Sequence, residues 1–141
     1  MSGRVPYSGG CRCGAVRYSA AGEPAATRVC WCRDCQYFGA GSGTVNVVFA
    51  KSALSVSGTL SDYASLSASG NVMHRRFCPI CGTPVFSDTD ARPNVVIVRA
   101  GTLDDPDSVA TAMTIWTASA PAWACFDSSL PQVVGQPPPA P

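Results

Sequence analysis

The chain has 141 residues and a formal net charge of +1, with ten lysines and arginines against nine aspartates and glutamates. This length predicts one domain with a modest core, which a bound metal ion would stabilise considerably. The balanced charge argues against a nucleic-acid surface built on net positive charge, and no run of basic residues occurs.

The sequence shows no secretion or membrane segment, and its C-terminal end differs in composition from the predicted domain. Residues 1–10 contain no apolar stretch that could serve as a secretion signal. The longest apolar runs, near Val45–Ala50 and Val95–Val98, are far shorter than the ~20 residues of a membrane-spanning helix. We therefore expect a soluble, cytoplasmic protein without a membrane partner, in a compartment that disfavours disulfides. One domain is predicted over residues 1–131, followed by a disordered, Pro-rich tail over 132–141.

The first cysteine pair, Cys11 and Cys13, precedes a segment that alternates apolar and polar residues over Ala15–Ala20. The alternation predicts a strand. Two cysteines at this spacing can direct both thiolates at one metal ion, but the site needs two more ligands from elsewhere in the chain.

A cysteine triplet follows at Cys30, Cys32 and Cys35. It supplies three thiolates and has no evident fourth ligand. The one histidine, His74, lies four residues before the next cysteine, and we interpret it as an ordinary strand or surface residue. An open fourth position, available to water or to a substrate atom, is therefore the better interpretation.

The segments between the cysteines are predominantly β in pattern, and Gly, Pro, Ser and Asp separate them at short intervals. Further strands are predicted over Thr44–Phe49, Leu54–Ser57, Thr59–Tyr63, Val72–Phe77, Pro84–Ser87 and Asn94–Arg99. Helix signals are weak. A turn or two is expected after Cys32, with Asp34 near its start and Gly39 or Gly41 at its end, and a second turn over Asp104–Val109. The sequence thus predicts a mostly β fold of antiparallel sheets with little helix.

The motif Cys78-Pro-Ile-Cys81-Gly has the form of a zinc knuckle. The proline presets the turn, and Gly82 permits a positive φ that lets backbone N–H groups point at the sulfurs. A redox pair is the alternative, but redox motifs of this type lie between a strand and a helix. Here strands are predicted on both sides.

The two pairs and the triplet predict two different zinc sites. Cys11, Cys13, Cys78 and Cys81 would form a closed site that staples the fold, whereas the triplet would form an open site. Three thiolates leave Zn²⁺ with a formal charge of −1, which suits a soft thiol ligand better than activation of water. A thiol held by zinc is present as the nucleophilic thiolate, so thiol chemistry is expected.

The remaining notable residues have ordinary structural interpretations. Cys125 is expected to be a small buried residue. Trp116 and Trp123 are expected in the core or in a pocket wall. Arg75 and Arg76 could hold a carboxylate, although a solvated strand edge is the preferred interpretation.

Five blocks of sequence together resemble the glutathione-dependent formaldehyde-activating enzyme family, which includes centromere protein V-like proteins. They are Gly9–Tyr18, Cys30–Gln36, Arg76–Pro84, Val98–Pro106, and a last block with Ile115–Trp116, Ser119, Trp123 and Leu130–Pro131. The order and spacing of the blocks carry the resemblance over most of the chain.

The resemblance implies a zinc-stapled β-tent fold. It also implies a structural zinc on Cys11, Cys13, Cys78 and Cys81, and a catalytic zinc on Cys30, Cys32 and Cys35. In the activity that names the family, glutathione adds to formaldehyde to give S-hydroxymethylglutathione, which is formally a carbon–sulfur lyase run backwards. Glutathione is then the expected co-substrate.

Two positions depart from the family pattern. Many members carry histidine where this chain has Trp31 and Thr114. A missing imidazole removes a possible proton carrier or a partner of a metal ligand. The fold and both metal sites are expected to survive these changes.

Two other functions stay open at this stage. One is a non-catalytic interaction module in which both zinc ions are structural. The other is reduction of oxidised methionine, which needs a reactive cysteine outside the zinc sites. Cys125 alone is available for that role, and no resolving partner is evident.

Overall fold

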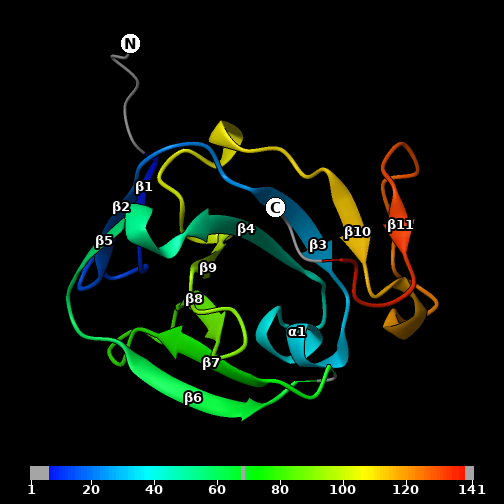
Figure 1. The fold of residues 1–141 in the computed structure, drawn as a ribbon, viewed down its shortest axis with the longest axis horizontal. Helices are drawn as coiled ribbons and strands as arrows, with labels where there is room; N and C mark the ends of the chain where they lie inside the picture. Colours follow the sequence, from blue (N-terminus) through cyan, green and yellow to red (C-terminus); the bar gives the residue numbers. More distant parts are fainter. Residues whose placement is uncertain (1–6, 68, 139–141) are drawn as a thin grey trace.

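The computed structural model describes residues 7–67 and 69–138 and contains two β-sheets (Figure 1). The smaller sheet has the order β1-β2-β5, with β1 (Tyr7–Gly10), β2 (Arg17–Ala20) and β5 (Leu54–Ser57). The larger sheet has the order β11-β10-β3-β4-β9-β8-β7-β6. Its strands are β3 (Ala26–Cys30), β4 (Thr44–Ala50), β6 (Ser61–Leu66), β7 (Val72–Phe77), β8 (Pro84–Thr89), β9 (Val95–Arg99), β10 (Met113–Ile115) and β11 (Gln132–Val133).

Helical structure is sparse in the described residues. The α-helix α1 covers Arg33–Phe38, and Gly39 follows it as the C-cap. The 3-10 turns are η1 (Lys51–Ala53), η2 (Ala100–Thr102), η3 (Pro106–Ser108) and η4 (Thr117–Ser119). Asp105 caps η3 by accepting a hydrogen bond from Asp107 N, and Pro106 fixes its first φ. Between residues 7–67 and 69–138, no helix combines the length and the hydropathy needed to cross a lipid bilayer.

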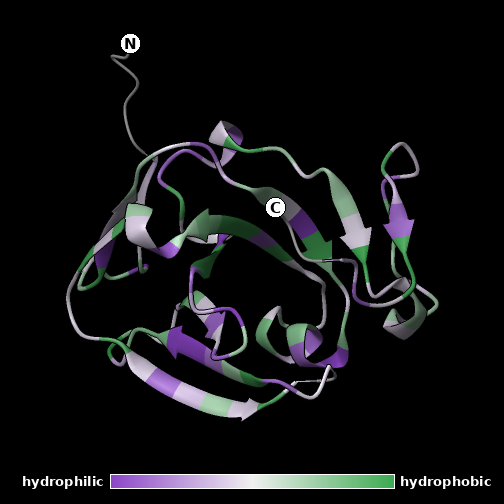
Figure 2. Ribbon diagram, viewed as in Figure 1, coloured by the Kyte–Doolittle hydropathy of each residue, from purple (hydrophilic) through white to green (hydrophobic). Residues whose placement is uncertain are grey.

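The central strands β4 and β9 separate the hydrophobic core from the functional side of the molecule. Side chains alternate between the two faces of a strand. On one face Val47, Phe49, Val96 and Val98 are almost fully buried and join the main core cluster with the small sheet. The opposite face carries polar residues, among them Asn46 and Arg99. Most residues of β4 are buried, so both faces of this strand are covered. Figure 2 shows β4 as mostly hydrophobic and β7 as mostly hydrophilic.

The larger sheet curves strongly, so that β3, β4, β9, β8, β7 and β6 follow an arc with α1 beside its open end (Figure 1). From β3 through β6 the neighbouring strands are antiparallel. At the other edge, β10 runs parallel to both β3 and β11. The mostly β prediction with little helix is confirmed, and this parallel edge is an addition that the sequence did not indicate.

The predicted strands and turns agree with the structure within one to three residues at most ends. This holds for β2, β4 to β9, the helix after Cys32 and the turn at Pro106. The strands β1, β3, β10 and β11 were not predicted. β3 has the sequence Ala-Thr-Arg-Val-Cys, which has no long apolar run, and its strand state depends on pairing with both β4 and β10.

The predicted disordered tail over 132–141 differs from the structure in residues 132–138. Gln132 and Val133 form β11, and Thr114 N donates to Pro131 O at 3.0 Å. Further on, Gln136 Oε1 accepts a hydrogen bond from Trp116 Nε1 at 2.9 Å. The tail is ordered here because β10 offers it an open sheet edge. Residues 139–141 of this prediction lie outside the described residues.

Candidate metal centres and the adjoining pocket

The cysteine triplet is assembled where β3 passes into α1. Cys30 is the last residue of β3, Cys32 is the N-cap of α1, and Cys35 lies in its first turn. Cys32 Sγ accepts a hydrogen bond from Cys35 N at 3.3 Å. The three Sγ atoms lie within 4.8 Å of one another, and Cys30 and Cys35 are buried. A strand end followed by a helical turn thus directs all three sulfurs at one point.

Hydrogen bonds from Gln36 and the backbone hold this turn in place. Gln36 is buried, and its Nε2 donates to Trp31 O at 2.8 Å and to Ser119 O at 3.0 Å. Trp31 N donates to Ile115 O at 3.0 Å. Because these bonds tie the triplet loop to β10 and η4, the sulfurs are held by elements far apart in sequence.

The four-cysteine cluster joins two hairpin turns. Cys11 and Cys13 come from the turn between β1 and β2, and Cys78 and Cys81 from the turn between β7 and β8. Val16 N donates to Cys11 Sγ at 3.2 Å, and Ile80 N to Cys78 Sγ at 3.4 Å. Positive φ angles at Gly14 (85°) and Gly82 (79°) shape the two turns, and the one at Gly82 was expected from the knuckle motif.

The donor sets and spacings fit zinc. All eight cysteines are free thiols. Zinc–sulfur bonds of about 2.3 Å in tetrahedral geometry place two sulfurs about 3.8 Å apart. The Sγ atoms of Cys11 and Cys13 are 3.6 Å apart, and those of Cys13 and Cys78 are 3.8 Å apart. In the part of the chain that the structure describes, no histidine, cysteine or carboxylate completes the triplet as a fourth ligand.

The thiols in each cluster differ in how readily they ionise. Hydrogen bonds from Cys30 and Cys32, aided by the charge of Arg99, lower the pKa of Cys35. The hydrogen bond with Cys32 raises the pKa of Cys30. In the other cluster, hydrogen bonds from Thr83 lower the pKa of Cys81 to about 5. Each cluster therefore contains at least one thiol whose lowered pKa favours the thiolate, the form that binds metal.

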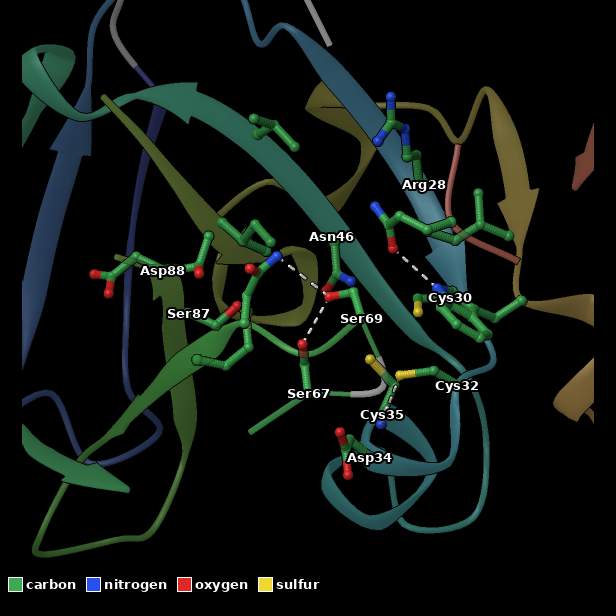
Figure 3. Close-up of a pocket in the computed structure, with 18 of the residues that line it drawn as sticks. Arg28, Cys30, Cys32, Asp34, Cys35, Asn46, Ser67, Ser69, Ser87 and Asp88 are labelled. Carbon is green, nitrogen blue, oxygen red and sulfur yellow. Dashed lines mark hydrogen bonds between the residues drawn. The ribbon is translucent and has the colours of Figure 1, made fainter. Parts of the chain in front are cut away.

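A pocket of about 290 Å³ lies on the polar face of the curved sheet, next to the triplet (Figure 3). Its lining includes all three triplet cysteines. The strands β3, β4 and β9 contribute Arg28, Asn46 and Arg99, and α1 contributes Asp34. The sheet face opposite the core thus forms one wall of the pocket, and the helix cap carries the thiols into it.

The two departures from the family pattern lie away from this pocket. Trp31 is buried against Trp123 and Phe126, with ring centroids 6.3 and 5.9 Å away. Thr114 is buried and pairs with Val29, so it lies on the strand face opposite Cys30. Neither residue is among those that line the pocket. Trp31 and Thr114 are therefore buried outside the pocket lining.

His74 and Trp116 lie where the sequence analysis expected them, on a strand outside the metal sites and in a pocket wall respectively. His74 contacts Asp62 and Asp90 and takes no part in either cysteine cluster. Trp116 lines the pocket, and its backbone has a φ of 58°. Such a left-handed conformation is uncommon for a bulky residue and occurs most often at functional sites.

Three expectations were wrong. Cys125 is exposed, because its segment lies on the surface beside η4, and Trp123 is 69% exposed. Arg75 was expected on a solvated strand edge, yet it is only 7% exposed. Its guanidinium lies 5.1 Å from the centre of the Phe38 ring and bonds Asp34 at 3.4 Å. The helix α1 covers this face of β7, which the strand pattern alone did not indicate.

Sequence reasoning did not single out Arg28, Asn46 and Arg99, which the structure places in the pocket lining. One signal was present: Arg28 is two residues before Cys30, so the two side chains share a face if the segment is a strand. That segment was not predicted to be a strand. Asn46 and Arg99 stood within apolar runs and looked like isolated polar residues.

Comparison with known proteins supports the fold and the family. A family model described as "Glutathione-dependent formaldehyde-activating enzyme" matches residues 6–119. No curated protein matches the chain. A crystal structure of a Rhodobacter sphaeroides protein is similar, with a TM-score of 0.55 and 24% identity over 72% of this chain and 93% of that chain. At this identity the similarity shows the fold alone.

Proposed function

Since the chain belongs to the glutathione-dependent formaldehyde-activating enzyme family, we propose that it catalyses the addition of a thiol to an aldehyde. Glutathione and formaldehyde are the proposed pair, with S-hydroxymethylglutathione as the product. The reverse reaction breaks the carbon–sulfur bond, which makes the enzyme formally a carbon–sulfur lyase. The observation that carries this proposal is a three-thiol cluster in the wall of a pocket, with no fourth ligand among the described residues.

The reaction needs neither an oxidant nor a reductant. The thiol sulfur forms a bond to the aldehyde carbon, the carbonyl π electrons move to oxygen, and the proton lost by sulfur is balanced by one gained by oxygen. A zinc ion held by Cys30, Cys32 and Cys35 would keep the substrate sulfur as a thiolate near neutral pH.

The residues around the triplet hold its cysteines in position and limit the access of bulk water. Gln36 holds the loop that bears the cysteines, and the sheet face opposite them forms the pocket wall. All three cysteines line the pocket, and the burial of Cys30 and Cys35 limits their contact with bulk water. An electrostatic interaction in such a partly dry site is stronger than the same interaction in water. The four-cysteine cluster lies at the junction of the two sheets, and we assign it a structural role.

The decisive experiment measures zinc per chain in protein purified without chelator, followed by the rate of S-hydroxymethylglutathione formation by NMR. The spontaneous rate without protein is subtracted. We expect about two zinc ions per chain and a rate above the spontaneous one that Cys32→Ser abolishes. Two zinc ions with no acceleration for glutathione or other thiols would overturn the proposal and favour a non-catalytic, zinc-stabilised interaction module.

A further inference from the structure

Three polar residues form a row across the pocket wall. Arg28 of β3 lies directly opposite Asn46 of β4, and Asn46 lies directly opposite Arg99 of β9. Neighbouring strands are about 4.8 Å apart, so the row places the Cα atoms of the two arginines about 10 Å apart. Cys30 is on the same face of β3 as Arg28, because the two residues are two positions apart. The Arg28–Asn46–Arg99 row therefore lies beside the triplet.

Arg99 is buried without an acidic partner. It is 9% exposed, and its Nη1 donates to Thr44 Oγ1 at 3.2 Å and to Asn46 Oδ1. Its Nε has no hydrogen-bond partner among the described residues, and no carboxylate lies within ion-pair distance. A buried cation without a carboxylate partner is costly unless another anion offsets it, and the triplet thiolates or a ligand can do so.

Arg28 is the second cation of the row. It is half-buried, and within the described ranges its side chain has neither a hydrogen bond nor an ion pair.

The carboxylates of the pocket are already engaged elsewhere. Asp34 pairs with Arg75 at 3.4 Å. Asp88 bonds Arg76 at 3.2 Å and lies 3.6 Å from Lys51. Neither acid neutralises the row, so the pocket offers positive charge to a ligand that carries its own anion.

We infer that the Arg28–Asn46–Arg99 row binds a carboxylate of the substrate thiol while the sulfur of that thiol lies at the triplet. This inference rests on the proposed function. A guanidinium group presents paired N–H donors that match the two oxygens of a carboxylate. Figure 3 shows Arg28 and Cys30 on the same strand, with Cys32 and Cys35 farther from Arg28 than Cys30 is. The geometry thus favours a thiol whose carboxylate is several bonds from sulfur, such as a peptide thiol, over a short mercapto acid.

The test uses the zinc-loaded protein and S-methylglutathione, whose blocked sulfur leaves the carboxylates as the main anchor. Calorimetry should show binding to the unmodified protein, and Arg28→Gln should weaken it about tenfold or more. Arg17→Gln removes the same charge from an exposed pair with Asp104 outside the pocket, and should leave the affinity unchanged. Arg28→Lys keeps the charge without the planar fork, and should bind with intermediate affinity.

The outcomes separate this inference from the proposed function. No binding of S-methylglutathione, or equal binding by Arg28→Gln and Arg17→Gln, would overturn the carboxylate site even if glutathione addition is still accelerated. Equal acceleration of 2-mercaptoethanol and glutathione would also overturn it, because 2-mercaptoethanol has no charge to recognise. Conversely, Arg28-dependent binding without acceleration of any thiol would uphold the carboxylate site and remove the proposed reaction.

Discussion

Gly9 lies where β1 passes close to η2, and the space there admits no side chain. A Cβ atom at this position would lie 2.2 Å from Thr102 O and 2.5 Å from the Tyr18 hydroxyl. Thr102 Oγ1 donates to Arg99 O at 2.7 Å, so the Tyr18 hydroxyl, also at 2.7 Å, donates to Thr102. Burial raises the pKa of Tyr18 to about 12, which keeps this donor protonated. The neighbours of Gly9 are thus fixed by bonds that link β2, η2 and the end of β9.

We predict that Gly9→Ala lowers the free energy of unfolding by about 1–3 kcal/mol or more, because the methyl group must displace this network. Gly101→Ala is the matched control, since a Cβ there would meet no atom within 4 Å. Its effect should stay within about 0.5 kcal/mol. Urea unfolding at fixed zinc concentration measures both, and equal effects of the two substitutions would contradict the packing argument.

At the scale of elements, charged side chains link the strands β6, β7 and β8 at one edge of the larger sheet. His74 of β7 lies between two carboxylates, with Nδ1 2.7 Å from Asp62 on β6 and Nε2 3.0 Å from Asp90 after β8. Arg76, next but one along β7, bonds Asp88 on β8 and lies 3.9 Å from Asp62. These contacts join three successive strands at an edge that has little apolar packing.

The hydrogen bonds to Asp62 and then to Asp90 raise the pKa of His74 above its usual 6.5. A group whose pKa is raised by folding stabilises the native state fully below its unfolded pKa, and this stabilisation is lost as pH rises through the folded pKa. We therefore predict that the melting temperature of the unmodified protein exceeds that of His74→Gln near pH 6. The difference should shrink steadily toward pH 9. A difference that stays constant over this range would show that protonation of His74 does not stabilise the fold.

At the scale of the whole molecule, the two cysteine clusters connect the chain over different lengths. Cys13 and Cys78 are 65 residues apart, so the four-cysteine cluster ties the small sheet to the β7–β8 turn of the larger one. The triplet spans only Cys30–Cys35 and forms part of the pocket wall. A cross-link that closes a long loop removes more entropy from the unfolded chain than a local one.

We predict different outcomes for Cys81→Ser and Cys32→Ser. Cys81→Ser should lose zinc and unfold, although Cys81 is exposed, because the two sheets lose their shared metal site. Cys32→Ser should stay folded and retain about one zinc ion per chain. Metal analysis with thermal melts tests both, and equal thermal destabilisation would contradict the division into structural and catalytic sites.

Much of the fold, the triplet and each of the two cysteine pairs could be predicted because their signals are local. The triplet cysteines are brought together by one strand end and one helical turn, and the knuckle at Cys78 and Cys81 by one tight turn. Likewise, the alternating segments at Thr44–Phe49 and Val72–Phe77 indicate strands, whichever strands they pair with. Short-range geometry decides these features, so the sequence by itself determined the mostly β class and the candidate metal ligands.

The tertiary structure alone decided what surrounds those thiols. Arg28 and Arg99 are 71 positions apart in sequence and share a row only because β3, β4 and β9 pair in one register. A shift of one residue would turn the side chains of that row to the core face. The burial of Arg75 under α1 and the pairing of β11 with β10 likewise depend on contacts between distant segments. Strand register and helix packing are set by burial across the whole chain, so no local pattern could specify the charge and shape of the pocket.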